Sequence, residues 1–501
     1  MKNGQVMDAA DASCAREAIH LVGAIQPEGW LIVADVENFT ISHVSANIGE
    51  LFADGSNGML AAPLAYYLDQ RLIDTCLACG AVAIELGSAQ HVGRHNIGDM
   101  AQLCDVSVHC VNGLLQIEIE LAPARALSFG FNARAHAVVM RSADEPDLTA
   151  FAAHMVDQLR DLTGFDRVMA YRFLPDASGE VMAESLAEGM EPWLGQRYPA
   201  SDIPAQARAL YLKNRIRVVA DTAYRPVPIL AAQQPAVPPL DMSYNVLRSL
   251  SPIHMQYLRN MGVAASMSVS VVFDGQLWGM LLFQHRQARR VWAEARNALE
   301  LLGAFFSVRV AAHVQAENQA ARSRVDDIFA MLDLSLAHST GFNAILPLIA
   351  CLLRNDGIVV LRGDEWCASA AGQGERERSA MHAWLAAHPD QRILHGQQLD
   401  WRGEVSADSD VAGVMALRLA PGKPDWLLFL RRPYDEEIHW AGIPDKHVEQ
   451  AEDGSLRIAP RADFSVWREL RRGGGEPWLD DEVATVQRLA DLLDTWAVST
   501  D

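Results

Sequence analysis

The pattern of hydrophobic and polar positions divides the chain into three segments that mix strands and helices. In the first segment, residues 15–125, short apolar runs alternate with turns, and the runs at 30–33 and 114–119 predict strands. The polar stretch 142–148 predicts a boundary, because it separates these runs from an amphipathic helix expected over 148–162.

The second segment repeats this arrangement of helix and strands. Strands are predicted over 167–173 and 179–185, after the helix. A further pair of runs at 266–273 and 277–283 is separated by Asp274-Gly275, a two-residue turn typical of a β-hairpin. These two strands are therefore expected to pair with each other.

Prolines interrupt the second segment between 225 and 240. They predict a long excursion without regular structure, because proline fixes φ and removes a backbone donor. A loop of this length inside a domain typically has a function or a partner. The residues are Pro226, Pro228, Pro235, Pro238 and Pro239.

A long helical region joins the second segment to the third. The pattern predicts one or two helices over 291–336, with Leu301, Phe305, Val308 and Ala312 on one face. Two interpretations remain open. The stripe either packs against the core of its own domain, or the helix extends between domains and exposes part of the stripe to a dimer partner.

The third segment again alternates strands with helices. Strands are predicted over 357–361, 414–419 and 426–430, and a final helix over 480–495. Glycines and prolines break this pattern over 431–477, which predicts a second long excursion. Three sensory-type domains joined by helices, two of them with extended arms, form an unusual outline for an enzyme.

Length and charge narrow the class of protein. At about 150 residues per domain, 501 residues predict about three domains. The net charge of −21, with no run of basic residues, argues against a nucleic-acid partner. No stretch of about 18 apolar residues is free of charges, and the polar N-terminus lacks the apolar core of a secretory signal. A cytoplasmic protein without a membrane partner is expected.

The seven cysteines predict free thiols, because their number is odd and their spacing irregular. Cys76 and Cys79 are spaced like metal ligands, but no second close pair accompanies them, so no metal site is predicted. Cys14 is different, because Arg16 nearby could lower its pKa and favour the reactive thiolate.

The densest group of polar residues lies in the second segment. Asp202 precedes a helix expected to begin near Pro204, so it is either a helix cap or part of a binding site. No nucleophile elbow, phosphate-binding loop or zinc-protease helix accompanies it. Hydrolase and transferase chemistry is therefore not predicted.

Cations, hydroxyls and an imidazole follow on otherwise apolar elements. Ser266 and Ser268 are two apart on a strand and are expected to face one side. Arg217 and Arg248 suit the carboxylate groups of a ligand, because guanidinium groups bind carboxylates bidentately. The alternative is that the arginines are solvated and that His254 is a hydrogen-bonded core histidine.

These residues stand in longer strings that together resemble the bacteriophytochrome family over essentially the whole chain. In order, the strings are CAREAIHLVGAIQPEG, FDRVMAYRF, RYPASDIPAQARALY, LRSLSPIHMQYLRNMGVAASMSVS, LWGML, HWAGIP and APRADFSVW. The resemblance implies an α+β fold of three domains, each a central antiparallel sheet flanked by helices and joined by long helices. These would be an N-terminal segment with a PAS domain at 1–140, a GAF chromophore-binding domain at 141–315 and a PHY domain at 316–501.

The resemblance also implies two extended features. The N-terminal segment would pass through a loop of the GAF domain and form a knot, for which residues 225–247 are the candidate loop. The excursion at 431–477 would be the tongue by which the PHY domain reaches the chromophore pocket.

Biliverdin, a linear tetrapyrrole, is the implied cofactor, joined to Cys14 by a thioether. Asp202 would lie by the pyrrole nitrogens, His254 would stack over the inner rings, and Arg461 would reach from the tongue to Asp202. The propionates would be held by Tyr211, Arg217, Arg248, Ser251, Ser266 and Ser268. The cavity of ring D would be lined by Met169, Tyr171, Trp193 and Tyr198. Ile203, Pro204, Tyr257 and Gln284 complete the expected contacts.

Three positions depart from the family pattern. Glu28 replaces a usual histidine, with little effect expected. Gln284 replaces a histidine that bonds the ring D carbonyl, which predicts an altered red-absorbing state because an amide cannot become charged. Asp463 replaces a tongue serine that partners Asp202 after the tongue refolds to helix. A second carboxylate there predicts an unstable far-red-absorbing state that reverts fast.

The leading prediction is a non-enzymatic red/far-red photoreceptor module, in which light isomerises ring D and refolds the tongue to signal to an output module or partner. Two alternatives remain: a sensor of another ligand or of redox state through Cys14, and the sensory half of a light-regulated histidine kinase. No phosphoacceptor helix or ATP-binding lid follows the final helix. The chain is therefore expected to be a fragment or to act through a partner. A homodimer through the long helices is also expected.

Overall fold

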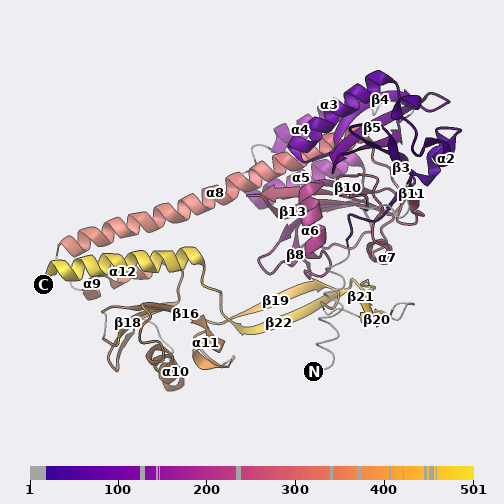
Figure 1. Ribbon diagram of the computed structural model, residues 1–501. Helices are drawn as coiled ribbons and strands as arrows, with labels where there is room; N and C mark the ends of the chain where they lie inside the picture. Colours follow the sequence, from indigo (N-terminus) through magenta and orange to yellow (C-terminus); the bar gives the residue numbers. More distant parts are fainter. Residues whose placement is uncertain are drawn as a thin grey trace. The chain divides into compact units, whose positions relative to one another are not determined.

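The chain forms two compact units, Met1–His313 with His439–Trp467 and Val314–Ile438 with Arg468–Asp501. Helix α8 (Ala293–Ala337) runs without a break from the larger unit into the smaller one (Figure 1). The computed structural model describes residues 18–123, 130–142, 145, 147–232, 239–338, 342–368, 374–404, 408–420, 423–444, 448–450, 456–458 and 460–500. Cys14 lies outside the described residues.

The first sheet of the larger unit is antiparallel, with the strand order β1-β11-β3-β2-β6-β5-β4. Its apolar face packs against α3 (Gln70–Leu86), which begins where Asp69 accepts a hydrogen bond from the Leu72 N–H and ends at Gly87, with φ 61°. The predicted strands at 30–33 and 114–119 are confirmed as parts of β2 and β6. The bounds are β1 (Ala24–Ile25), β2 (Gly29–Asp35), β3 (Ile41–Ser45), η1 (Ala46–Glu50), α2 (Gly55–Met59), η2 (Leu64–Tyr66), β4 (Gln90–Ile97), β5 (Gln102–Val111) and β6 (Leu114–Leu121).

The prediction that prolines exclude regular structure between 225 and 240 is wrong. Strand β11 (Val227–Ala231) lies there and pairs with β1 on one side and β3 on the other. Ile229 donates its N–H to Gly23, on the β1 side, so the nitrogen of Pro228 faces the β3 side. Pairing with β3 starts only at Ile229, and Pro228 therefore removes no ladder hydrogen bond.

The N-terminal segment is held between the two ends of this excursion. Ala24 and Ile25 pair with Pro228 and Val227, while the Ser249 N–H donates to the Ala24 carbonyl at 3.0 Å. Met242 N–H likewise donates to the His20 carbonyl at 2.9 Å. The segment 20–26 is thus fixed by backbone hydrogen bonds to residues on both ends of the predicted loop.

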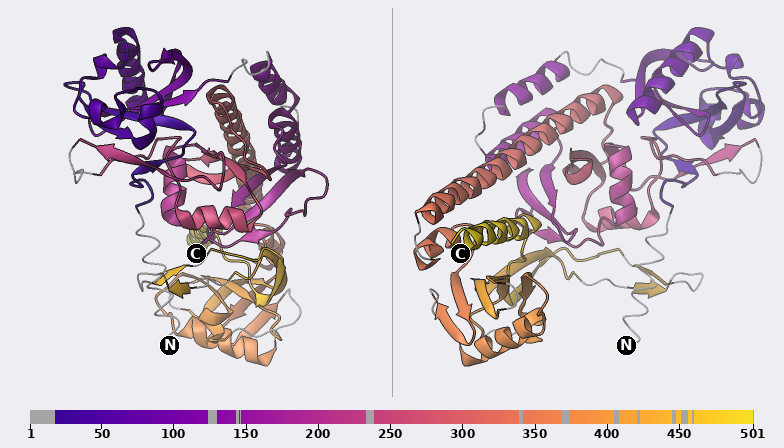
Figure 2. Two further views of the ribbon diagram at one scale, coloured as in Figure 1. Left: turned by 90° about the vertical axis from the view of Figure 1, so that its right-hand side faces the viewer. Right: turned by 60° about the vertical axis from the view of Figure 1, so that its left-hand side comes forward.

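The second sheet of the larger unit has the order β10-β12-β13-β7-β8-β9-β19-β22. Helix α5 and the first half of α8 pack side by side on one face, and α6 and α7 lie on the other (Figure 2). The helix predicted over 148–162 and the hairpin at 266–283 are confirmed. The bounds are α4 (Phe131–Ser142), α5 (Leu148–Thr163), β7 (Arg167–Phe173), β8 (Gly179–Leu186), β9 (Arg197–Tyr198), α6 (Ala205–Lys213), β10 (Ile216–Val219), α7 (Pro252–Asn260), β12 (Ala265–Phe273) and β13 (Gln276–His285).

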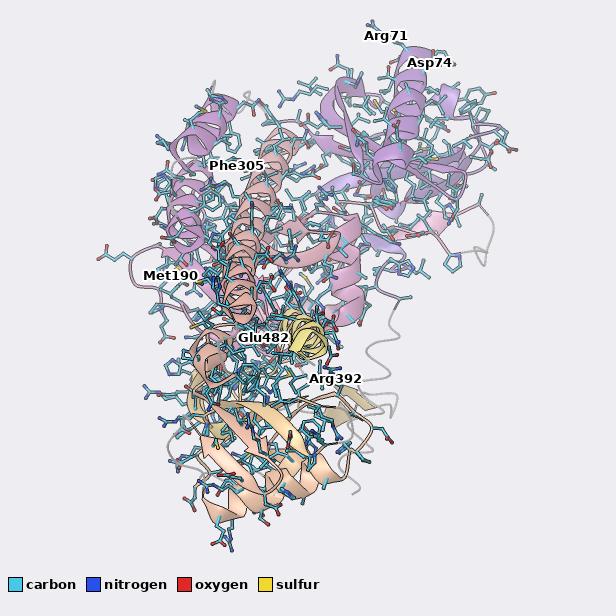
Figure 3. All side chains as sticks on the ribbon, turned by 90° about the vertical axis from the view of Figure 1, so that its left-hand side faces the viewer. Arg71, Asp74, Met190, Phe305, Arg392 and Glu482 are labelled. Atoms are coloured by element: carbon cyan, nitrogen blue, oxygen red, sulfur yellow. The ribbon has the colours of Figure 1, made fainter. Side chains whose placement is uncertain are left out.

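The predicted stripe on α8 faces solvent rather than the core. Leu301 and Val308 are 73% and 65% exposed, whereas Leu302 and Phe306, one or two residues away, are buried. Phe305 lies at the border, with its ring 5.8 Å from that of Phe151 on α5 (Figure 3). The interpretation in which this stripe packs against its own domain is therefore wrong.

The excursion at 431–477 contains strands rather than a structureless loop. Strands β19 (Tyr434–Ala441) and β22 (Val466–Gly474) are neighbours, and a smaller pair, β20 (Val448–Gln450) and β21 (Leu456–Ile458), lies between them in sequence. Trp440 of β19 forms a single parallel bridge with Arg197 of β9. The end of β19 thereby joins the second sheet.

The smaller unit has one antiparallel sheet, in the order β15-β14-β18-β17-β16. Its two faces alternate along each strand: Val360 and Phe429 pack with α9, α12 and the end of α8, whereas Val359 and Leu428 pack with α10 and α11. Figures 1 and 2 show α10 and α12 on opposite faces of this sheet. The bounds are α9 (Phe342–Ala350), β14 (Gly357–Arg362), β15 (Glu365–Ala368), α10 (Glu375–Ala386), β16 (Ile393–Gln397), α11 (Gln398–Arg402), β17 (Gly413–Arg418), β18 (Asp425–Arg431) and α12 (Asp480–Thr500).

Candidate functional site

A cavity of about 310 Å³ opens on the second sheet of the larger unit, between α6, α7 and the segment 460–463. A smaller cavity of about 80 Å³ continues from it over the strands β7, β12 and β13. We call the two together the sheet cavity. Both parts share a lining of Asp202, Ile203, Tyr211, Arg217, Leu250, His254 and Tyr257.

The alternation of β12 explains why the cavity floor is polar on an otherwise apolar strand. Met267 and Val269 are buried on the face toward α8, which comes so close that a Cβ on Gly303 would lie 2.4 Å from Val269. Ser266 and Ser268 point the other way and line the smaller cavity. The structure therefore places both serines on one face, toward the site.

Asp202 is the polar centre of the cavity and does not cap a helix. The N-cap of α6 is Pro204, and the Asp202 backbone N–H closes a turn onto the Pro199 carbonyl at 3.0 Å. One carboxylate oxygen accepts a hydrogen bond from the Tyr257 hydroxyl at 3.0 Å, and the other lies 3.3 Å from Nη2 of Arg461. Burial and the Asp202 charge raise the pKa of Tyr257 well above its usual value, so the phenol stays a donor.

Arg461 is held in place by hydrogen bonds to the end of β19 and to α7. Its Nη1 donates to the carbonyls of Ala441 and Ile443, each at 2.8 Å, and its own carbonyl accepts from the Asn260 side chain at 2.8 Å. Gly442, with φ 82°, allows this close approach, because a Cβ there would lie 2.1 Å from the Asp463 carbonyl.

The Asp463 carboxylate takes no part in the ion pair between Asp202 and Arg461 and forms its hydrogen bonds elsewhere. Its carboxylate accepts from the Ser465 N–H at 2.8 Å, and hydrogen bonds to Ser465 together with the Arg461 charge lower its pKa below the usual value. The side chain is exposed and ionised, although it lines the mouth of the cavity with Arg461. Two carboxylates, Asp202 and Asp463, therefore border one cavity.

Arg217 and Arg248 are buried beside each other without a carboxylate partner. They are 5% and 6% exposed, and among the described residues neither forms a salt bridge. Arg217 donates instead to the carbonyls of Asn245, Val246 and Arg248, and Arg248 donates to that of Ile19. Burial lowers the pKa of both, and the neighbouring Arg217 lowers that of Arg248 further.

Further hydrogen-bond donors are available where Arg217 and Arg248 line the cavity. The Nε groups of Arg217 and Arg248 have no hydrogen-bond partner in the part of the chain that the structure describes. Such buried, unpartnered cations are costly unless an anion completes them. Tyr211 and Ser251, also at the cavity, add hydroxyl groups.

His254 lies in the cavity wall on α7 with its ring parallel to that of Tyr257, at 12° and 6.2 Å between centroids. Burial and the charge of Arg217 lower its pKa to about 4, so the ring is neutral at pH 7. Within the described residues it makes no hydrogen bond. The hydrogen bond expected of a core histidine is therefore not seen among these residues.

The far end of the cavity is aromatic and tightly packed. Met169 and Tyr171 on β7 and Tyr198 on β9 line it, and Tyr171 meets Tyr198 edge-on at 5.9 Å. Only glycine fits at 179, because a Cβ there would lie 1.9 Å from the Tyr171 hydroxyl. Trp193, also expected here, lies behind Tyr198 at 6.4 Å between centroids and does not line either cavity.

Gln284 lies in this end of the cavity, opposite Ser266 in the β12–β13 ladder. It is 6% exposed, and its carbonyl oxygen has no hydrogen-bond partner among the described residues. The site therefore holds an unused acceptor where the resemblance led us to expect histidine.

The structure brings together every other described residue that the sequence pointed to, including Ile203 and Pro204 at the α6 N-terminus. Sequence reasoning missed Ile19, Asn214, Ile253 and Met261, which also line the cavity. Ile19, Ile253 and Met261 stand inside the strings quoted above, so those strings were the available signal.

Comparison with known proteins identifies the family. The family models that match are "PAS fold" at residues 14–122, "GAF domain" at 147–314 and "Phytochrome region" at 322–500. A bacteriophytochrome of Xanthomonas campestris is 30% identical, over 96% of this chain and 78% of the relative. The chain belongs to the bacteriophytochromes.

Other relatives and solved structures agree with this assignment. A bacteriophytochrome of Pseudomonas aeruginosa is 35% identical over 96% of this chain. The crystal structure of a bacteriophytochrome from R. palustris superimposes with a TM-score of 0.81, at 29% identity, over 97% of this chain and 99% of that one. The photosensory core module of a Stigmatella aurantiaca phytochrome gives 0.78 at 30% identity, over 96% and 97%.

This bacteriophytochrome chain spans 66% of the length of the Pseudomonas relative and 65% of a phytochrome from Nostoc. The predicted fold class, helices and antiparallel sheets in the arrangement of a phytochrome photosensory core, is confirmed. None of the described helices is long and apolar enough to cross a membrane.

Proposed function

We propose that this bacteriophytochrome chain binds biliverdin in the sheet cavity and works as a red/far-red photoreceptor module. The observation that carries the proposal is the buried pair Arg217 and Arg248, which has no acidic partner among the described residues. A guanidinium pair buried in this way matches a ligand with two carboxylates, and biliverdin has two propionates. Tyr211, Ser251, Ser266 and Ser268 supply hydroxyl groups on the same side.

The centre of the cavity fits a cationic conjugated ring system. Asp202 presents its carboxylate there, and neutral His254 and Tyr257 offer parallel rings for stacking. Because His254 is uncharged, it does not compete with a protonated ligand for Asp202. Bound in this place, biliverdin would supply the light-absorbing system whose ring D isomerises.

The two ends of the cavity differ in what they can hold. The arginine end fixes charge, whereas the other end is lined by Met169, Tyr171, Tyr198 and Gln284, none of which is a cation. Two polar atoms there, the Tyr198 hydroxyl and the Gln284 carbonyl oxygen, have no hydrogen-bond partner among the described residues. We propose that ring D lies at this aromatic end and that the tongue, tied to Asp202 through Arg461, changes conformation when its polar partners change. Cys14, outside the described residues, would form the thioether.

Output and assembly are part of the same proposal. The exposed stripe on α8, with Leu301 and Val308, would pack against a second copy of the chain in a homodimer. A signal would then pass to an output module or partner, which in the whole protein could be a histidine kinase.

One absorption experiment tests the proposal. Incubation of the full chain with biliverdin should produce a strong red or far-red band that changes after red light and returns in the dark or after far-red light. The Cys14→Ser variant should still bind but lose the pigment on denaturation. No band with biliverdin in the parent chain would overturn the proposed function and favour a sensor of another ligand.

A further inference from the structure

The polar face of β6, on the first sheet, reaches the segment that carries Arg248. On this strand Leu115, Ile117 and Ile119 pack into the core of the first sheet. The alternate residues Gln116 and Glu118 are equally buried but polar. They must therefore find hydrogen-bond partners outside their own core.

Glu118 finds its partners in the segment 245–248. Its two carboxylate oxygens accept the backbone N–H groups of Leu247 at 2.7 Å and of Val246 at 3.1 Å. The buried side chain of Gln116, two residues earlier on the same face of β6, donates to the Asp241 carbonyl at 2.8 Å. The first sheet thus holds the backbone just before Arg248.

The same short segment holds the arginine pair from its other side. Arg217 donates to the carbonyls of Asn245 at 3.0 Å and Val246 at 3.1 Å, and also to that of Arg248. The peptide groups of 245–248 therefore lie between a carboxylate that binds their N–H groups and a guanidinium that binds their carbonyls. Moving this segment would move both guanidinium groups.

We propose that Glu118, which lies outside the sheet cavity, is a positioning residue that sets where Arg217 and Arg248 present their guanidinium groups to the ligand carboxylates. This inference rests on the proposed function. Glu118 acts through the backbone of Val246 and Leu247, and it does not contact the ligand. When Glu118 is ionised, its charge also faces Arg217 across the segment, which favours the guanidinium form of Arg217.

Glu118 is a costly group to keep, which supports a role beyond packing. Burial raises its pKa to about 7, against the lowering by the two N–H groups. Glu120 on the same strand raises the pKa of Glu118 further, and Arg296 on α8 opposes it. An apolar residue would avoid this cost but would leave two buried N–H groups unpaired.

The test compares biliverdin with its dimethyl ester, in which both carboxylates are blocked. Binding is measured by quenching of tryptophan fluorescence in the full chain with Cys14→Ala, so that attachment does not trap the ligand. Glu118→Gln should weaken binding of the free acid about tenfold, because one N–H then faces an amide NH₂ instead of a carboxylate oxygen. Binding of the dimethyl ester should change less than about twofold.

Glu120→Gln is the matched control, on the same face two residues along, because Glu120 pairs with Arg296 and not with 245–248. Glu120→Gln should weaken the binding of the free acid and of the dimethyl ester equally, or should leave both unchanged. Should Glu118→Gln fail to fold, Glu118→Asp keeps the charge, shortens the reach and should show the same selectivity for the free acid.

Two outcomes overturn the inference while leaving the proposed function standing. One is an equal loss of both ligands in the Glu118 variants, which would mean a purely structural role. The other is no loss of either ligand. Failure of the parent chain to bind biliverdin would instead overturn the proposed function, and with it the ligand to which the inference refers.

Discussion

Two buried arginine sites in the larger unit differ in their counter-ions. Arg296 on α8 is 5% exposed and binds the carboxylate of Glu120, with two guanidinium nitrogens on two oxygens. Arg217 and Arg248 are as deeply buried, but within the described ranges they bind only carbonyl groups. The arginine that joins two parts of the fold is neutralised by a carboxylate of the same chain. The arginine pair at the cavity would instead be neutralised by the carboxylates of a bound ligand.

The largest expected effect is on the free energy of unfolding, which should respond differently to substitution of Arg296 and of Arg248. Arg296→Met leaves Glu120 buried and unpaired except for Arg290 at 3.8 Å, so the free energy of unfolding should fall by about 3 kcal/mol. Arg248→Met removes a buried charge that has no counter-ion, and the free energy of unfolding of the apoprotein should change by less than about 1 kcal/mol. Urea unfolding followed by tryptophan fluorescence measures both.

Biliverdin should reverse this order. Arg248→Met should bind the free acid far more weakly than Arg296→Met does, because only Arg248 faces the cavity. If both variants lost the same stability and the same affinity, the counter-ion would not distinguish a ligand site from a structural one.

The pH dependence of stability gives the next largest effect, through His254. Its pKa is about 4 in the fold against 6.5 in the unfolded chain, so between these values the unfolded chain binds the extra proton. The free energy of unfolding is therefore not reduced by His254 above pH 6.5. It falls as the pH is lowered from 6.5 toward 4. Because part of the ring faces the cavity, we expect a loss of about 2 kcal/mol.

His254→Phe isolates this contribution, and the measurement is urea unfolding of the apoprotein from pH 7.5 to 4.5. Glu118 acts in the opposite direction. Because the fold raises the pKa of this carboxyl to about 7, its contribution to the free energy of unfolding is lost as the pH rises from 4.5 to 7. That trend is common to both proteins and cancels in the difference. A difference that stayed flat with pH would contradict the neutral, buried state of His254.

The sequence predicted strands well where alternation is local and failed where pairing is distant. The strand expected at 179–185 matches β8, in which buried positions alternate with partly exposed ones along the strand. Strand β11 was missed because its partners, β1 and β3, lie about 200 residues earlier, and prolines dominate its own signal. On α8, apolar residues such as Leu301 and Leu302 are adjacent, so periodicity could not fix the buried face.

The site shows the same division between local and distant information. The shared face of Ser266 and Ser268 followed from strand geometry alone. The contact between Asp202 and Arg461, 259 residues apart, could be expected only from the family resemblance. Glu118 was invisible to both approaches, because its role depends on a loop segment that lies 129 residues further along the chain.

The counter-ion comparison extends to the tongue, with a smaller expected effect. Asp202 is neutralised by Arg461, while Asp463 is an ionised second carboxylate at the same cavity. If a light-driven change moves Arg461 away, two negative charges remain, and the far-red-absorbing state should revert fast. Asp463→Ser should slow thermal reversion about fivefold, because it removes one of the two like charges.

Reversion is followed by absorbance in the dark after red light, at low and high salt. Asp463→Asn, which removes the charge but keeps the shape, is the matched control and should slow reversion to a similar degree. An unchanged rate in both variants would mean that Asp463 does not meet Asp202 in the far-red-absorbing state.

The smallest effect concerns the uncharged end of the cavity, where the buried carbonyl oxygen of Gln284 has no hydrogen-bond partner in the described part of the chain. Gln284→His would replace this acceptor by a ring that can donate to ring D and can become charged. A neutral hydrogen bond at the weak end of the usual range is worth about 0.5 kcal/mol, so the photoconversion yield should shift by about twofold, together with a displaced red band. Gln284→Leu, which removes the polar group, serves as the control. Spectra and yields of Gln284→His identical to those of the parent would show that ring D does not depend on this position.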